Sequence, residues 1–224
     1  MSYLTAVGVL IISYFLGAIP FGLILVWLRT GKDVRQVESG RTGGTNALRA
    51  AGYWIGLLTG ILDVLKSASA VWIAKWLVPG AIWLDVLAPI VAVIGHNYSI
   101  FLAERTANGR IRLRGGAGGA PTGGGLLGLY PPVFLVALIV GIIMFFIVGY
   151  ASLTTLSIPI VAILSFTYLA WVGKVPWEYI VYGVITGIIL LWALRPNIRR
   201  LLNGTERMVG FRARRKRDIK DESR

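Results

Sequence analysis

Two polar segments of the sequence combine glycine with arginine, a combination suited to binding phosphate. The first, ESGRTGGTNALR, spans residues 38–49, and the second, RLRGGAGGAPTGGG, spans residues 112–125. Glycine lets backbone N–H groups approach an oxyanion closely, and arginine adds a planar fork of donors. The second segment is not a Walker A loop, because no Gly-Lys-Ser/Thr follows its glycines. The alternative interpretation of such a glycine-rich stretch is a flexible linker.

The pattern of the first segment also predicts the start of a helix. Thr45 or Asn46 is a favourable N-cap for a helix that begins at Ala47. The N-terminus of a helix carries unpaired N–H groups and a partial positive charge, and both attract anions. Arg49 lies in the first turn of this predicted helix, where it can add a bidentate contact to a phosphate. An ordinary capped loop with cytoplasmic arginines is the alternative.

A few polar residues interrupt the apolar stretches. Asp63 and Lys66 are three residues apart, so they can pair on one helical face. A charge inside an apolar stretch is costly unless it is paired or hydrated, so both a functional role and a structural ion pair are open interpretations. His96, the only histidine, lies in GHNYS, which we interpret as a hydrogen-bonding cluster near a helix start. Glu38 and His96 are the candidate general bases.

The composition indicates an integral membrane protein. Of the 224 residues, 56% are hydrophobic, and the mean hydropathy is +0.72. A soluble domain of this size cannot bury so much apolar surface. With no cysteine and one histidine, the chain is predicted to have no disulfide and no metal site.

The basic residues predict the orientation of the chain in the membrane. Of 23 Lys and Arg, five fall in residues 29–49, four in 105–114 and eleven in 195–224. Basic loops and tails stay cytoplasmic, so these three clusters are expected on one face, with the N-terminus outside. This topology accounts for the net charge of +13, and we therefore predict no nucleic-acid partner.

The apolar stretches predict an all-α, polytopic helix bundle. A first spanning helix is expected at 3–28, with a kink at Pro20. Residues 1–202 are expected to form a single membrane domain and 203–224 a basic cytoplasmic tail. Further apolar stretches at 47–78 and 82–103 precede a basic, glycine-rich loop expected at 104–125.

The number of crossings after that loop is not settled by hydropathy. The apolar stretch at 126–194 must cross an even number of times if both flanking basic clusters are inside. It shows three blocks, at 126–148, 151–172 and 176–194. Five crossings in all, with one block re-entrant, and seven crossings, with the blocks subdivided, are both possible.

Six motifs in the same order resemble the bacterial acyl-phosphate:glycerol-3-phosphate acyltransferases. They are GAIPFG at 17–22, DVRQVESGRTGGTNALR at 33–49, LDVLK at 62–66, GHNYSIFL at 95–102, RGGAG at 114–118 and NIRRLLNGTE at 197–206. The resemblance implies a multi-pass bundle of seven helices in the plasma (inner) membrane of a bacterium, with a cytoplasmic active site. It implies transfer of an acyl chain from acyl phosphate to the 1-hydroxyl of glycerol 3-phosphate, giving lysophosphatidate and phosphate in phospholipid synthesis, without a cofactor. Oligomeric state is left open.

The resemblance also assigns candidate site residues. The predicted catalytic residues are Ser39, Arg49 and Asn197. The predicted substrate-binding residues, which combine the resemblance with the local chemistry above, are Gly40, Thr45, Asn46, Arg112, Arg114, Gly115, Gly116 and Gly118. Supporting roles are expected for Asp63, Lys66 and His96.

The chain departs from the family pattern at several positions. Ala117 and Leu194 stand where the family has a lysine and a histidine, and Arg41 stands where it has an asparagine. Arg112 or Arg114 can replace the missing lysine, since arginine also binds phosphate. The departures raise the alternative that the chain is an inactive relative that binds or transports anionic lipids or phosphorylated solutes.

Overall fold

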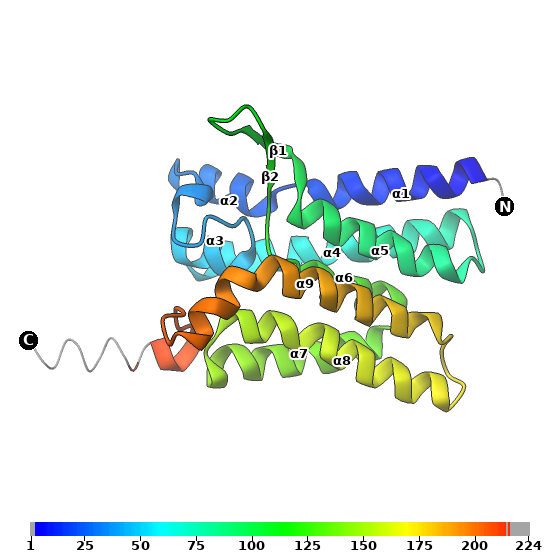
Figure 1. The fold of residues 1–224 in the computed structure, drawn as a ribbon. Coiled ribbons are helices and arrows are strands. Elements are labelled where there is room, and N and C mark those ends of the chain that lie inside the picture. Colours follow the sequence, from blue (N-terminus) through cyan, green and yellow to red (C-terminus); the bar gives the residue numbers. More distant parts are fainter. Residues whose placement is uncertain (1–2, 214, 216–224) are drawn as a thin grey trace, which may run out of the picture.

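The computed structural model describes residues 3–213 and 215, and the long helices run alongside one another in alternating directions (Figure 1). The helices are α1 (Tyr3–Ala18), α2 (Phe21–Thr30), α3 (Gly44–Ala51), α4 (Tyr53–Leu77), α5 (Ile82–Asn97), α6 (Gly119–Leu129), α7 (Pro131–Ile143), α8 (Ala151–Trp171) and α9 (Glu178–Leu202). Shorter elements are the 3-10 turn η1 (Val34–Gln36), the π-helical turn η2 (Met144–Val148) and the strands β1 (Ser99–Arg105) and β2 (Ile111–Arg114).

The predicted kink at Pro20 is a complete break in the first helix. α1 ends at Ala18 and α2 begins at Phe21, because proline has no N–H to continue the helical hydrogen bonds. The break frees the carbonyl oxygen of Ile19, which accepts a hydrogen bond of 2.9 Å from Lys66 Nζ. The same oxygen also accepts a hydrogen bond of 3.1 Å from Phe21 N–H, so a buried cation and a backbone amide together satisfy it at the break.

Five segments of the described chain are long and apolar enough to cross a membrane. They are Tyr3–Thr30, Tyr53–Leu77, Pro131–Val148, Ala151–Trp171 and Glu178–Leu202. α5, with 16 residues, and α6, with 11, are shorter than these. The predicted block 126–148 is divided at Tyr130, where α6 ends and α7 begins. Seven crossings therefore remain a prediction that depends on α5 and α6.

The glycine-rich stretch is only partly a loop. Residues 119–125 were expected in the loop at 104–125, but they form the first turns of α6. Their lack of side chains allows close packing, since a Cβ atom at Gly124 would lie 2.0 Å from the carbonyl oxygen of Val64 on α4. Small residues that let helix backbones approach are the usual packing device in membranes. The linker interpretation is wrong for this part of the segment.

Gly124→Ala is therefore expected to destabilise the protein by about 1–3 kcal/mol, because the new methyl group overlaps the α4 backbone. Thermal unfolding of the detergent-purified variant measures this. The matched control is Gly141→Ala on α7, where an added Cβ meets nothing within 4 Å. Equal stability of the two variants would contradict the close contact between α4 and α6.

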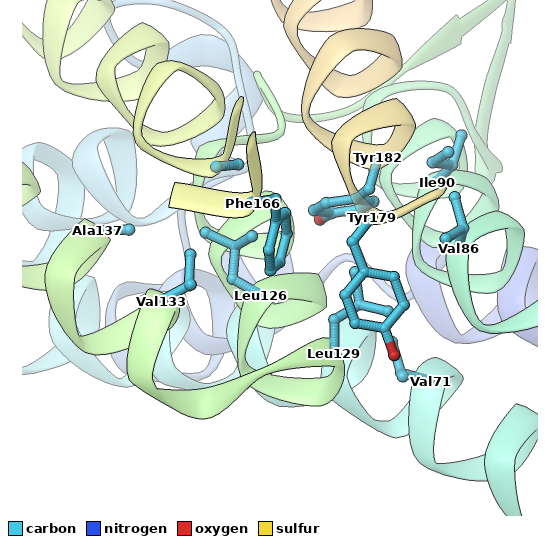
Figure 2. Close-up of a cluster of buried hydrophobic side chains, with 11 residues drawn as sticks. Val71, Val86, Ile90, Leu126, Leu129, Val133, Ala137, Phe166, Tyr179 and Tyr182 are labelled. Carbon is cyan, nitrogen blue, oxygen red and sulfur yellow. The ribbon is translucent and has the colours of Figure 1, made fainter. Parts of the chain in front are cut away.

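A buried aromatic cluster fixes α6 in the bundle (Figure 2). Phe166 of α8 and Tyr182 of α9 are fully buried and pack in one cluster with Leu126 of α6. Tyr182 Oη also donates a hydrogen bond of 2.7 Å to the carbonyl oxygen of Thr122. Because α6 is held in this way, the loop that precedes it is held as well.

A β-hairpin, which was not predicted, projects from the helices between α5 and α6 (Figure 1). The helix expected to extend through the apolar stretch 82–103 ends at Asn97, so His96 lies in the last turn of a helix and not near a helix start. β1 and β2 are antiparallel. Glu104 of β1 accepts from Arg35 at 2.9 Å and pairs with Arg114 at 2.7 Å, which ties the hairpin to the segment before α3.

The chain continues to pack on the bundle after α9. Val209 N–H donates to the carbonyl oxygen of Gly149 at 2.9 Å, and Glu206 and Val209 are buried. Packing therefore extends past residue 202, where the sequence predicted the tail to begin. Part of that basic tail, residues 214 and 216–224, lies outside the described residues.

Candidate functional site

A small pocket lies where three parts of the chain meet: the segment around α3, the start of α8, and the end of α9 with the residues that follow it. It is lined by Ser39, Arg49, Ala151, Asn197, Arg200, Glu206 and Arg207. We call it the arginine pocket. The three residues that the sequence predicted as catalytic, Ser39, Arg49 and Asn197, thus lie together although they are up to 158 positions apart.

Asn46 shapes the loop that carries Ser39. Its Nδ2 lies within hydrogen-bond distance of three carbonyl oxygens, those of Val34 at 3.0 Å, Val37 at 2.9 Å and Arg41 at 2.8 Å. Its Oδ1 accepts from Ser39 N–H at 3.4 Å. Both ends of this buried amide are occupied by the loop, so in this structure Asn46 positions Ser39 and is not free to contact a phosphate.

The helix that follows begins earlier than predicted. α3 starts at Gly44, its N-cap is Gly43, and no side chain caps it, so the prediction of Thr45 or Asn46 as N-cap is wrong. Thr45 lies instead in the first turn of α3. Gly44 suits this position because a Cβ atom there would lie 2.9 Å from the carbonyl oxygen of Gly56 on α4.

Glu206 positions Asn197 from the other side of the pocket. Its Oε1 accepts from Asn197 Nδ2 at 3.1 Å, and its Oε2 accepts from Ser152 Oγ at 2.9 Å. The carboxylate therefore joins α8, α9 and the C-terminal segment. Sequence reasoning missed Glu206, Arg200 and Arg207, although Arg200 and Glu206 lie in the NIRRLLNGTE motif from which only Asn197 was selected.

The arginine pocket has more positive than negative charge. Arg207 forms an ion pair with Glu38, whereas the Arg49 guanidinium has no hydrogen-bond or ion-pair partner among the described residues. Burial lowers the pKa of Arg49, with an opposing influence from Glu38. A bound phosphate would compensate this lost hydration, so the pocket is suited to an anion.

The glycines at 115–118, which we call the glycine loop, lie directly on the end of α5. Gly116 N–H donates to the carbonyl oxygen of His96 at 3.0 Å. A Cβ atom at Gly116 would lie 1.9 Å from His96 Nε2, and one at Gly115 would lie 2.0 Å from the His96 carbonyl oxygen. Gly118 has a φ of +92°, a conformation that favours glycine. Glycine is thus required here for packing, whatever the loop binds.

The predicted pairing of Asp63 with Lys66 is confirmed, and His96 joins it. Lys66 Nζ lies 2.8 Å from Asp63 Oδ1 and 2.9 Å from His96 Nδ1, and all three residues are buried. Because a lysine ammonium only donates, His96 Nδ1 accepts this hydrogen bond. His96 lies against the glycine loop, and none of the three residues lines the arginine pocket, so the structure does not support His96 as a general base there.

The other predicted arginines belong to the hairpin. Arg114 is held by Glu104 at 2.7 Å, and Arg112 is exposed on β2. Gly40 has a φ of +66°, and a Cβ atom there would lie 3.9 Å from Arg114 Nη1. Arg114 therefore adjoins the loop before α3, but neither Arg112 nor Arg114 lines the arginine pocket.

Comparison with known proteins places this arrangement in a family. A family model described as glycerol-3-phosphate acyltransferase matches residues 7–204. The chain belongs to the glycerol-3-phosphate acyltransferase family. As a member of this family it is an acyltransferase, in agreement with the resemblance of the six motifs.

Two curated members of the glycerol-3-phosphate acyltransferase family match nearly the whole chain. Glycerol-3-phosphate acyltransferase 3 of Dehalococcoides mccartyi is 36% identical over 217 residues, which cover 92% of this chain and 96% of that protein. The glycerol-3-phosphate acyltransferase of Thermus thermophilus is 34% identical over 214 residues, which cover 93% and 97%.

The fold matches solved structures of the same acyltransferase family. PlsY, an integral membrane glycerol 3-phosphate acyltransferase, superimposes in its glycerol 3-phosphate form with a TM-score of 0.78 at 30% sequence identity. This match covers 92% of this chain and 96% of that one. Its lysophosphatidic acid form superimposes with a TM-score of 0.74.

Proposed function

We propose that this acyltransferase transfers an acyl chain from acyl phosphate to the 1-hydroxyl of glycerol 3-phosphate. The observation that carries the proposal is the arginine pocket, where Ser39, Arg49 and Asn197 meet beside Arg200 and Arg207. An excess of guanidinium groups over carboxylates suits a substrate that carries phosphate. The named relatives and the glycerol 3-phosphate form of PlsY support this acceptor.

The chemical step needs little from the protein beyond positioning. The 1-hydroxyl oxygen forms a bond to the acyl carbon, the bond from that carbon to the phosphate oxygen breaks, and phosphate leaves with the electron pair. The proton of the hydroxyl passes to a phosphate oxygen, which is tolerable because phosphate is a good leaving group. In the pocket, Glu206 already accepts hydrogen bonds on both oxygens, and Glu38 is paired with Arg207. The products are lysophosphatidate and inorganic phosphate, at an early stage of phospholipid synthesis.

The basic residues around the pocket support its placement on the cytoplasmic face of the bacterial plasma membrane. α3 and the end of α9, which contribute residues to the pocket, lie with α2 at one end of the bundle, and the start of α1 lies at the opposite end (Figure 1). Two of the basic clusters, at 29–49 and from 195 onward, belong to these elements. Positive charge stays inside, which supports a cytoplasmic pocket and C-terminus with the N-terminus outside.

The test is an assay of the detergent-purified protein with a long-chain acyl phosphate and glycerol 3-phosphate. We expect lysophosphatidate and inorganic phosphate to appear in equal amounts, and acyl-coenzyme A to be a far poorer donor. Arg110→Ala, a change at an exposed residue outside the pocket, is the control and should retain full activity.

The second candidate is an inactive relative that binds anionic lipids or phosphorylated solutes. It is motivated by Ala117 and Leu194, which are uncharged where the family has a lysine and a histidine. Folded protein that binds glycerol 3-phosphate in calorimetry but produces no lysophosphatidate from any donor would favour this candidate and reject the transferase.

A further inference from the structure

The last turns of α9 have two different faces. One face points into the protein, where Asn197 and Arg200 line the arginine pocket. The other face carries exposed residues three or four positions apart, a spacing that places side chains in one row along a helix. We call this row the outer stripe, and its members are Trp192, Arg195, Arg199 and Leu202.

The outer stripe continues a surface of α9 that faces lipid. Toward the middle of the helix the same face carries exposed apolar residues, namely Val184, Ile188 and Leu191. They belong to a segment that is long and apolar enough to cross a membrane. Apolar side chains on the outside of such a segment contact acyl chains, so the outer stripe lies where this lipid-facing surface reaches the end of the bundle.

Helix length places the two arginines of the stripe at the level of the lipid headgroups. Trp177 is exposed just before α9 and contacts the ring of Trp83, as expected for aromatic residues at a membrane boundary. Arg195 and Arg199 follow Trp177 by about 27 and 33 Å at the helical rise of 1.5 Å per residue. Since the hydrocarbon core is about 30 Å thick, both guanidinium groups reach the opposite headgroup layer.

Local structure holds Arg195 in place. Pro196 follows it within α9 and has no N–H to donate to the carbonyl oxygen of Trp192. Arg195 Nε donates to this oxygen instead at 3.1 Å, and its guanidinium carbon lies 3.2 Å from the centre of the Trp192 ring. The terminal nitrogens of Arg195 make no hydrogen bond with the described residues, so they are available to a ligand outside the protein.

The charge of the outer stripe is not neutralised by the described part of the chain. No ion pair among the described residues includes Arg195 or Arg199. The nearest carboxylate in sequence, that of Glu206, accepts hydrogen bonds from Ser152 and Asn197 on the other side of the helix. Two like charges four residues apart repel each other, and an anion between them removes this repulsion.

We propose that the outer stripe binds the headgroup of an anionic phospholipid, whose acyl chains lie along Ile188 and Leu191. The phosphate accepts charge-assisted hydrogen bonds from Arg195 and Arg199, and Trp192 contacts the interfacial part of the lipid. A zwitterionic lipid fits less well, because its ammonium group adds a third cation beside the two arginines. This surface is separate from the arginine pocket, so the inference does not rest on the proposed function.

The test measures lipid binding next to Trp192. The full-length protein is placed in vesicles of phosphatidylcholine with brominated chains, which quench nearby tryptophan, and unbrominated phosphatidylglycerol is then added in increasing proportion. The signal of Trp192 is the difference between each protein and the same protein with Trp192→Phe. We expect phosphatidylglycerol to be preferred over phosphatidylcholine by about 5- to 25-fold, since each arginine near an anionic lipid contributes about fivefold.

Three double variants separate the stripe from overall charge. Arg195→Gln with Arg199→Gln should lower the preference to less than about twofold, because both contributions are lost. Arg195→Lys with Arg199→Lys keeps the charges and should keep most of the preference. The matched control is Arg105→Gln with Arg110→Gln, which removes two exposed arginines of the hairpin and should leave the preference unchanged.

Each of four outcomes would overturn the lipid site. They are equal binding of the two lipids by the wild-type protein, an unchanged preference in the folded glutamine variant, and an equal loss in the hairpin control, which would make the preference an effect of net charge alone. The fourth is reversal of the phosphatidylglycerol signal by glycerophosphoglycerol, the same headgroup without chains, which would show a site for soluble phosphates. None of these measurements requires acyl transfer, so failure of the proposed function would leave the lipid site standing.

Discussion

Arg49→Ala is expected to lower kcat/KM for glycerol 3-phosphate by about 100- to 1,000-fold, the effect of removing one preorganised donor from a reacting anion. The Arg49 guanidinium lines the pocket with Ser39 and Asn197 and has no partner among the described residues. Glu38 offsets its desolvation only in part, and a bound phosphate would offset more of it. Initial rates of phosphate release, with glycerol 3-phosphate varied at a saturating concentration of acyl phosphate, give kcat/KM for each variant directly.

The controls separate charge from packing. Arg49→Lys keeps the charge but loses the planar fork, so we expect it to recover only part of the activity. Arg110→Ala removes an exposed arginine of the hairpin and should leave the rate unchanged. If Arg49→Ala kept more than about a third of the wild-type rate, a loss far below the range for one such donor, the acceptor phosphate would have to bind elsewhere.

Asp63→Asn is expected to destabilise the fold by about 3–5 kcal/mol, the usual effect of breaking a buried ion pair by removing one partner. Asp63 lies 2.8 Å from Lys66, and both residues are buried. Without the carboxylate, the Lys66 ammonium keeps only the Ile19 carbonyl oxygen and His96 Nδ1 as acceptors. Thermal unfolding in detergent, with size-exclusion chromatography to confirm the folded state, measures the loss.

A double variant decides between the structural and the functional interpretation of this pair. Asp63→Leu combined with Lys66→Met removes both charges and should recover most of the lost stability, since apolar replacements of a buried pair are often neutral. A stable double variant with normal turnover would make the pair structural, and a stable but inactive one would make it functional. A melting temperature of Asp63→Asn equal to that of the wild type would mean that the site is hydrated, contrary to its burial.

Much of the architecture could be predicted from local properties of the chain. Hydropathy and the clustering of basic residues indicate a membrane bundle because the bilayer selects long apolar segments and retains positive charge on one side. The pairing of Asp63 with Lys66 follows from helical spacing alone, and the structure confirms it. The six ordered motifs indicate the family, which the matched family model confirms.

The glycine-rich stretch shows where local reasoning fails. Glycine permits both a loop and a close helix contact, so composition cannot separate the two. Residues 115–118 remain a loop because they lie on His96, whereas residues 119–125 become helical because α4 offers them a surface that only glycine can approach. The packing partner of each segment, and not its residue type, decides whether the segment is a loop or a helix.

Some members of the site could be predicted from the sequence, but its arrangement could not. Ser39, Arg49 and Asn197 were identified from motifs, yet only the packing of α3, α8 and α9 brings them to one pocket. Only the tertiary structure shows that the Asn46 side chain hydrogen-bonds within its own loop and that Glu206 orients Asn197. It also shows that Arg41 donates a hydrogen bond to α9. None of these contacts follows from helical or strand periodicity, and the hydrogen bond between Arg41 and Ala193 joins residues 152 positions apart. The sequence therefore determined which chemical groups are present, and the tertiary structure decided which of them meet.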